Sequence, residues 1–274
     1  MATDAAFYID EIDKNGYCVI PGVFAPEKTS PALDYLSGYY RQEDLNPNTG
    51  SSQLDLGNDQ IVWNLQNKDI LFCDFLFGSP VIEEVLKAFL NDEWYKELPA
   101  EGPNYILHTY MARSGGHAPL RLHIDSLMPC IGPFTTAVSV LVCLERQDLE
   151  NGCTVVVPGS HLSGQYVKPE DRARAIPVPA NAGDVIVLDS RIWHGSAPND
   201  SGRSRWLLVA TFIRWWLKQG FNIPGNLPEE IYTQLNPSQK VVMGFCSIPP
   251  EDESDRHSAK LGLESLKPSV SAYK

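Results

Sequence analysis

The feature that most constrains the fold of this chain is a succession of short β-branched or aromatic runs between residues 104 and 214. Turn-forming sequences such as Ser114-Gly115-Gly116, Asn151-Gly152 and Gly183-Asp184 separate these runs. Short strands at near-regular spacing, divided by turn signals, are typical of a β-sandwich or barrel. We therefore predict a mainly β fold, a jelly roll with flanking α-helices. The expected strands span residues 105–111, 120–126, 135–144, 153–158, 185–188 and 206–213.

The pattern before residue 104 and after residue 214 is different. Pro26 favours a helix start, and Ser79-Pro80 can cap and begin another helix. The polar stretch 42–60 indicates a mobile loop. The other expected elements are helices over 7–14, 80–90 and 228–235 and a strand over 17–20.

We expect one domain over residues 1–274, since this length is normal for a single β barrel with helical additions. A mostly helical flank, 1–100, precedes the jelly-roll core, 104–214. The C-terminal extension, 215–274, is a candidate surface for a homodimer.

Composition excludes several classes of partner. The formal net charge of −12 argues against nucleic acid or an anionic membrane surface, because no basic excess exists to neutralise phosphates. No apolar run approaches the roughly 20 residues that span a bilayer. The N-terminus carries Asp4, Asp10 and Glu11, unlike a secretory or transit peptide, so the expected address is the cytoplasm. There, six cysteines without close paired spacing are expected to be reduced thiols rather than disulfides or a zinc cluster.

A candidate metal site begins with His123 and Asp125, two residues apart in one predicted strand. Residues i and i+2 of a strand face the same way, so these side chains would project together. With His194 they form a set of two imidazoles and one carboxylate. Such a set can occupy one face of a ferrous ion and leave three positions open, as a ferrous oxygenase requires. A His-x-Asp pair alone is a weak signal, because a hydrogen-bonded strand histidine gives the same pattern.

Arg205 follows His194 and begins the predicted strand 206–213. If it points into the barrel, its buried guanidinium needs a carboxylate or phosphate to pair with. A carboxylate of a bound co-substrate would meet that need. The alternatives are an Arg205 in a surface ion pair, or Arg203 in the inward position instead.

At these residues the chain resembles the phytanoyl-CoA dioxygenase family. The resemblance covers roughly residues 105–215 and includes the opening at 13–21. It implies a double-stranded β-helix of the cupin-like, jelly-roll type, with Fe(II) as metal and 2-oxoglutarate and O2 as co-substrates. It also implies oxidation of a C–H bond with release of succinate and CO2. The motifs are His123-Ile-Asp125, Asn151-Gly-Cys-Thr154, Pro158-Gly-Ser-His161, Gly183-Asp184 and His194-Gly-Ser-Ala-Pro-Asn199 through Arg205.

The same resemblance implies roles for individual residues. His123, Asp125 and His194 would bind iron, and Arg205 would hold the distal carboxylate of 2-oxoglutarate. Thr154 matches a position that contacts the co-substrate in fungal members. Those members often carry a Gln three residues before the first histidine ligand, where this chain has Leu120. His108, Thr109 and Tyr110 are candidate replacements for that contact.

The substrate is expected to be a small, fairly apolar molecule, such as a secondary metabolite. An acyl-CoA or an amino acid is the alternative within the family. A zinc hydrolase and a non-catalytic jelly-roll binding module are the alternatives outside it. For the tryptophans that could line the pocket, core packing is the competing explanation. The candidate substrate residues are Trp63, Asn64, Ser126, Leu127, Met128, Phe134 and Trp216.

Overall fold

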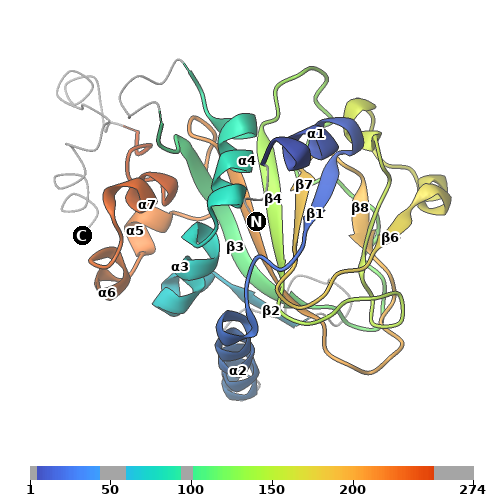
Figure 1. The fold of residues 1–274 in the computed structure, drawn as a ribbon, viewed down its shortest axis with the longest axis horizontal. Coiled ribbons are helices and arrows are strands. Elements are labelled where there is room, and N and C mark those ends of the chain that lie inside the picture. The colour runs from blue at the N-terminus through green and yellow to red at the C-terminus, as the bar shows by residue number, and fades with distance from the viewer. Residues whose placement is uncertain (1–4, 44–59, 94–100, 250–274) are drawn as a thin grey trace.

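The computed structural model describes residues 5–43, 60–93 and 101–249, and these form two facing β-sheets with helices on one side (Figure 1). The larger sheet has six strands in the order β1-β7-β4-β9-β3-β2, and the smaller has three in the order β6-β5-β8. All paired strands are antiparallel. The mainly β jelly-roll fold is thus confirmed. The strands are β1 Tyr17–Ile20, β2 Gln60–Trp63, β3 Tyr105–Ser114, β4 Ala137–Cys143, β5 Thr154–Val156, β6 Ile176–Val178, β7 Val185–Asp189, β8 His194–Ser196 and β9 Trp206–Arg214.

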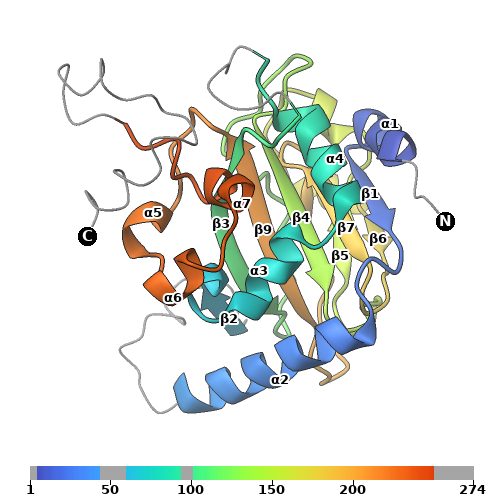
Figure 2. The same ribbon diagram turned by 60° about the vertical axis from the view of Figure 1, so that its left-hand side comes forward.

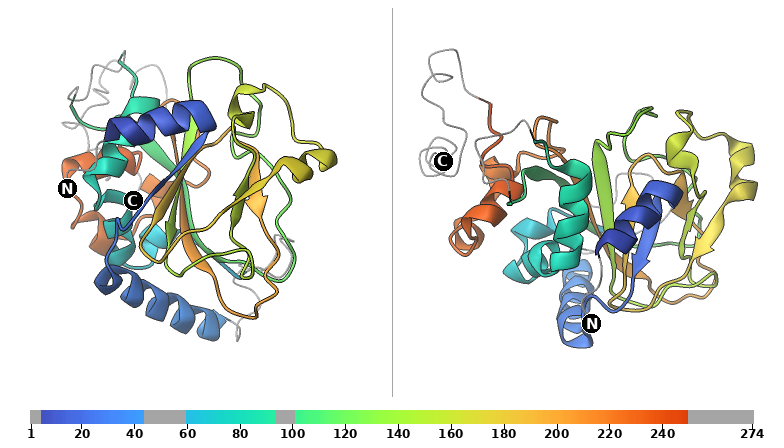
Figure 3. Two further views of the ribbon diagram at one scale, coloured as in Figure 1. Left: turned by 45° about the vertical axis from the view of Figure 1, so that its right-hand side comes forward. Right: turned by 45° about the horizontal axis from the view of Figure 1, so that its top comes forward.

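The central strand β4 is buried along its whole length, because helices cover one face of the large sheet and the small sheet lies opposite the other. Figure 3 shows α3 and α4 on the far side of the large sheet from β6 and β8. Strands buried on both faces carry near-continuous apolar runs, as Val185–Asp189 and Ala137–Cys143 do. The side of the large sheet that faces the small one is therefore an enclosed surface on which polar side chains are unusual.

The helices on the outer face bury an apolar core against the large sheet (Figure 2). In α4, Ile82, Val85, Leu86 and Phe89 recur at helical spacing and are all buried. Each such side chain contributes about 1.5–3 kcal/mol on burial. The helices are α1 Ala5–Asn15, α2 Pro26–Glu43, α3 Ile70–Phe77, α4 Pro80–Leu90, α5 Ile223–Asn226, α6 Glu229–Tyr232 and α7 Pro237–Val242.

The segment that follows β9 packs beside β3, where α5, α6 and α7 form a small cluster (Figure 2). The Gln219 side chain donates hydrogen bonds to the carbonyls of Leu107 and Met243, and so joins β3 to the end of α7. Within the described residues, no helix is both long and apolar enough to cross a membrane.

One strand prediction is wrong. Residues 120–126 form no strand but an irregular crossing, in which His123 makes an isolated bridge to His194. The chain turns at Asp125 and Ser126, whose N–H groups both donate to the carbonyl of Ser190. Apolar composition alone did not reveal this turn. The pattern also gave no signal for α3 or for the short strands β2, β6 and β8, and the predicted loop 42–60 lies mostly outside the described residues.

Candidate metal centre

His123, Asp125 and His194 meet on the inner side of the fold. Each offers one ligand atom, and these three atoms lie within 4.8 Å of one another. Nε2 of His123 lies 3.4 Å from Oδ1 of Asp125, and Nε2 of His194 lies 3.5 Å from Oδ2. Within the described part of the chain, no other group of three or more His, Cys, Asp or Glu residues has such geometry.

Backbone pairing brings the two histidines together. His194 begins β8, which pairs with β5. Its main chain exchanges two hydrogen bonds with that of His123, at 2.8 and 3.0 Å. Gly195 makes this approach possible, since a Cβ there would lie 2.5 Å from the carbonyl oxygen of Leu120 and 3.0 Å from that of Arg121. The glycine that follows His194 is therefore a steric requirement of the site.

Each imidazole is oriented by a main-chain carbonyl. Nδ1 of His123 lies 3.1 Å from the oxygen of Arg121, and Nδ1 of His194 lies 3.0 Å from that of Ile192. A carbonyl only accepts hydrogen bonds, so Nδ1 carries the proton in both rings and Nε2 keeps its lone pair. This is how proteins orient histidines that bind metals. Both free lone pairs lie on the side of Asp125.

Asp125 completes the set as a carboxylate. Ser139 of β4 donates a 2.7 Å hydrogen bond to its Oδ2. Burial alone would raise the pKa of Asp125, but His194, His123 and the Ser139 hydroxyl outweigh that effect and hold the pKa well below its usual range. Burial lowers the pKa of His194 despite the nearby carboxylate. Burial also acts to lower the pKa of His123, but Asp125 raises it overall. Two imidazole lone pairs and one ionised carboxylate suit a ferrous ion, and this donor set fits that metal.

The triad shares one pocket with two arginines. Arg205, the residue just before β9, is 3% exposed, whereas Arg203 is half-exposed. Arg205, and not Arg203, is therefore the arginine that points inward. Its guanidinium lies against Gly115, where a Cβ would come within 2.5 Å of Nη2. Arg113 of β3 is also buried and acts to lower the pKa of both histidines. Arg113 was not among the predicted site residues, since it lies two residues beyond the strand expected over 105–111, and the observed β3 extends to Ser114.

Thr154, the residue expected to contact the co-substrate, also lines this pocket. Its hydroxyl lies 3.5 Å from Oε1 of Gln147, and Nη1 of Arg205 lies 3.5 Å from the same oxygen. Gln147 is 1% exposed and was not among the candidates, since nothing in its local sequence distinguishes it. It connects the threonine and the arginine at one end of the pocket.

The structure separates His108 and Tyr110, two of the three residues considered as replacements for the missing glutamine. Tyr110 is buried against the helices, and its hydroxyl donates to the carbonyl of Phe72, so it points away from the pocket. His108 lies at the β-bulge between Leu107 and Thr109. Burial lowers the pKa of His108, while a main-chain hydrogen bond to Lys218 and the charge of Asp125 act in the opposite direction. Of the two, only His108 lies near the triad.

The predicted substrate residues fall into three places. Trp63 packs against Phe221. The residue after Trp63, Asn64, has a left-handed backbone conformation. Trp216 lines a separate cavity of about 580 Å³. The remaining candidates follow Asp125 directly in one loop, and its apolar members Leu127, Met128 and Phe134 are exposed.

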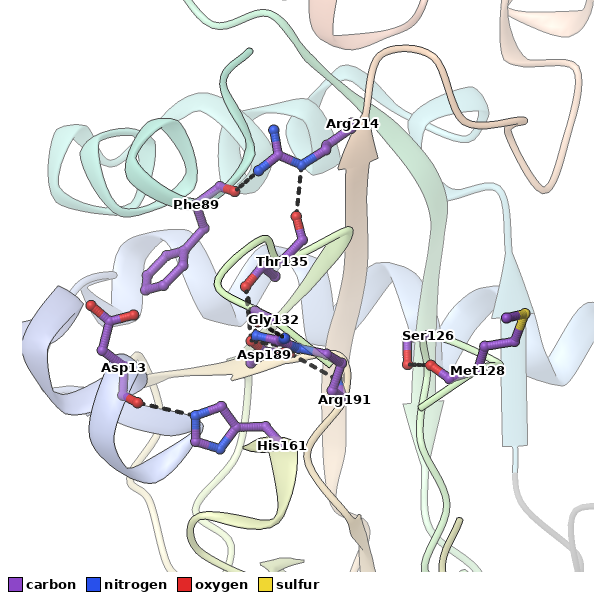
Figure 4. Close-up of polar contacts among 10 residues, drawn as sticks. All are labelled: Asp13, Phe89, Ser126, Met128, Gly132, Thr135, His161, Asp189, Arg191 and Arg214. Carbon is purple, nitrogen blue, oxygen red and sulfur yellow. Dashed lines mark hydrogen bonds and ion pairs between the residues drawn. The ribbon is translucent and has the colours of Figure 1, made fainter. Parts of the chain in front are cut away.

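The Pro158–His161 motif acts through the main chain near His194. The Ser160 hydroxyl accepts a 2.8 Å hydrogen bond from the N–H of Trp193. His161 contacts the carbonyl of Asp13 at the end of α1, as Figure 4 shows. The motif thus fixes the segment that leads into the second histidine of the triad.

Comparison with known proteins agrees with this geometry. The family model described as phytanoyl-CoA dioxygenase (PhyH) matches residues 12–206. Dioxygenase af480 of Aspergillus fumigatus is 28% identical over 244 residues, 86% of this chain and 76% of that protein. Dioxygenase himG of Aspergillus japonicus is 28% identical over 218 residues, 70% of this chain and 67% of that protein. The solved structure of the epimerase SnoN from nogalamycin biosynthesis has the same fold, with a TM-score of 0.58 at 19% identity over 77% of this chain and 82% of that one. The chain is an enzyme of the phytanoyl-CoA dioxygenase (PhyH) family.

Proposed function

We propose that this protein is a non-haem Fe(II), 2-oxoglutarate-dependent dioxygenase that oxidises a C–H bond of a small, fairly apolar metabolite. The observation that carries the proposal is the convergence of two oriented imidazole lone pairs and one ionised carboxylate beside a buried arginine. Membership of the PhyH family supports it. The similar fold of the epimerase SnoN, which was solved in complex with Fe3+, α-ketoglutarate and nogalamycin RO, also supports it.

In this proposal His123, Asp125 and His194 hold the metal. Bound iron would supply the activation of O2, coupled to decarboxylation of 2-oxoglutarate to succinate and CO2. The protein binds and orients the reactants and excludes water. The carbonyls of Arg121 and Ile192 keep both imidazoles in the metal-binding tautomer, and Ser139 keeps the carboxylate in place.

Arg205 is the residue we assign to the distal carboxylate of 2-oxoglutarate. A guanidinium pairs with a carboxylate through two parallel hydrogen bonds, which fixes both position and orientation. Thr154 lies beside it in the pocket, and Arg113 adds a second positive charge. The charge of a dianionic co-substrate would complement these two buried cations.

The surroundings favour an apolar substrate. Leu207 and Val209 of β9 line the triad pocket, and Ile213 lies on the same sheet face, about 7 Å beyond Thr211. Thr211 pairs with Ser139, and Ile213 pairs with Ile106, which lines the cavity of about 580 Å³. One wall of this separate cavity is therefore paired with β9, the strand that also lines the triad pocket. Among the described residues that line it, Lys218 is the one charged side chain, and the aromatic members are Trp215, Trp216 and Phe221.

The proposal is tested by turnover. Purified protein is incubated aerobically with Fe(II) and 2-oxoglutarate, and succinate is measured with and without a panel of apolar polycyclic metabolites. We expect slow succinate formation that a true substrate accelerates and that His123→Ala abolishes. His117→Ala is the matched control, because His117 lies six residues earlier in an exposed ion pair with Asp200. Iron-independent turnover, or succinate formation that survives His123→Ala, would refute the assignment.

We place this activity in the cytoplasm and assign the residues after β9 as a candidate dimer surface. Light scattering of the purified protein tests the second point, since a mass of one chain, 30.4 kDa, would contradict it.

A further inference from the structure

Residues 126–135 form most of the loop that separates Asp125 from β4. Their sequence, Ser-Leu-Met-Pro-Cys-Ile-Gly-Pro-Phe-Thr, contains no charged residue. Large apolar side chains in such a loop are normally buried, and here they are exposed: Leu127 by 79%, Met128 by 63%, Ile131 by 84% and Phe134 by 73%. An uncharged, outward-facing apolar loop next to a candidate metal ligand suits contact with an apolar substrate.

Both ends of this loop are held by one short turn, 189–191, and Figure 4 shows the contacts at the second end. At the start, the N–H groups of Asp125 and Ser126 donate to the carbonyl of Ser190, at 2.9 and 3.0 Å. At the end, the Thr135 hydroxyl donates to Oδ2 of Asp189 at 2.9 Å, and Nη1 of Arg191 donates to the carbonyl of Gly132 at 2.9 Å. The turn therefore closes the loop at its base and leaves the apolar side chains projecting.

The turn is itself fixed by a buried ion pair. Nε of Arg191 lies 2.9 Å from Oδ1 of Asp189, and Nη2 lies 2.6 Å from Oδ2, so the pair is bidentate. Arg191 is 6% exposed and Asp189 is 1% exposed. Buried pairs of this kind are weak contributors to stability compared with apolar side chains of the same size. The Asp189–Arg191 pair is better explained by the backbone geometry that it imposes on Ser190, the residue between the two.

We propose that the Asp189–Arg191 pair is a positioning element that couples the apolar loop 126–135 to the main chain of Asp125. The same carbonyl of Ser190 holds the candidate metal ligand and the first loop residue, so a shift of the loop base moves the carboxylate. The loop would bind the substrate with little further loss of conformational entropy, which favours rigid apolar substrates. This inference rests on the proposed function for its substrate, but the coupling belongs to the fold.

Internal contacts support a preset loop conformation. Leu127 has a φ of 62°, a backbone region that leucine rarely adopts. The Ser126 hydroxyl donates to the carbonyl of Met128 at 2.9 Å and so stabilises this turn. Strained positions persist where their surroundings determine them, and they concentrate at ligand-binding sites.

The test measures amide hydrogen exchange in the metal-free protein. The variant of choice is Asp189→Leu/Arg191→Met, which removes both charges and leaves neither buried alone. We expect exchange in the segment 123–135 to rise at least tenfold, with β4 and β9 unchanged. Labelling of the half-buried Cys130 with a thiol reagent should accelerate in parallel. Arg191→Lys keeps the charge without the bidentate geometry and should give an intermediate increase.

Leu86→Ala is the control for a general loss of stability, because Leu86 is buried in α4 on the other side of the large sheet. It should not raise exchange selectively in 123–135. The second measurement is the affinity for Fe(II) under anaerobic conditions, which should fall at least tenfold in the double variant and stay near wild type in Leu86→Ala. Wild-type exchange or wild-type Fe(II) affinity in the double variant would overturn the coupling. If the wild type itself binds no Fe(II), the proposed function fails, and hydrogen exchange alone still decides how the loop is held.

Discussion

The hydroxyl of Ser139 lies 2.7 Å from Oδ2 of Asp125 and donates a hydrogen bond to it. Ser139 is fully buried on the inward face of β4, where apolar side chains predominate. Its hydroxyl also lies 3.2 Å from that of Thr211 on β9. The large sheet thus supplies a short polar connection from β4 and β9 to the carboxylate of Asp125.

Ser139→Ala should weaken Fe(II) binding by about 10- to 100-fold, the usual loss when a partner that orients a metal ligand is removed. Anaerobic titration with Fe(II) measures this change. Thr211→Val is the matched control, since it removes the neighbouring hydroxyl and leaves the bond between Ser139 and Asp125. Equal losses of Fe(II) affinity in the two variants would show that packing, rather than this hydrogen bond, determines the affinity.

Gly195→Ala should also lower the affinity for Fe(II), by about tenfold or more. The new methyl group would overlap the carbonyl oxygens of Leu120 and Arg121 and displace the segment that carries His123. As a control, Gly38→Ala in α2 meets no atom within 4 Å and should stabilise the protein by about 0.5–1 kcal/mol. Wild-type affinity in Gly195→Ala would contradict the steric role assigned to this glycine.

Arg205→Lys should raise the dissociation constant for 2-oxoglutarate by about 10- to 150-fold, because a hydrogen bond to a charged group contributes about 1.5–3 kcal/mol and lysine cannot form the bidentate pair. The affinity for Fe(II) should change little, since Arg205 is not a ligand. Arg203→Lys, two residues earlier and half-exposed, should leave both constants unchanged. A larger effect at Arg203 than at Arg205 would reverse the assignment.

The buried thiols predict how stability depends on alkaline pH. Burial raises the pKa of Cys18, Cys73, Cys143 and Cys246 to about 12, against 9.0 for a free thiol. Above pH 9 the unfolded chain loses its thiol protons, while the folded state keeps them. The contribution of the buried thiols to the free energy of unfolding is therefore complete below pH 9 and is lost between pH 9 and 12. Urea unfolding should give a smaller free energy at pH 10 than at pH 7.5. Cys18→Ala should reduce the difference in unfolding free energy between the two pH values. An unchanged difference would argue against thiol ionisation as its cause.

Periodicity predicted the elements that have long, regular patterns. The strand at Tyr17–Ile20, the helix from Pro80 to Leu90 and the long strand β9 all carry uninterrupted apolar signals. The strands β6 and β8 have three residues each, too few for a period to appear. The segment 120–126 has strand-like composition, but His123 makes an isolated bridge to His194, and the N–H groups of Asp125 and Ser126 bond to the Ser190 carbonyl.

The candidate site was predictable to the extent that its residues lie in sequence motifs. His123, Asp125 and His194 do converge, although a turn and not a strand brings Asp125 beside His123. Arg113 and Ser139 reach the site through the pairing of β3 and β4 with β9, and Gln147 through an isolated bridge to Ala180, so no local sequence pattern indicates them. His108 and Tyr110 are two residues apart, but the β-bulge near His108 shifts the alternation of β3, and the Tyr110 hydroxyl bonds to Phe72 on the helix side.

The most direct test is an anaerobic titration of the Fe(II)-loaded protein with 2-oxoglutarate, followed by the weak visible charge-transfer absorption of the chelate. The wild type should develop the band, Asp125→Ala should lose it, and Arg205→Ala should require far more 2-oxoglutarate to reach it. A wild type that develops no band and instead purifies with tightly held zinc would contradict the account.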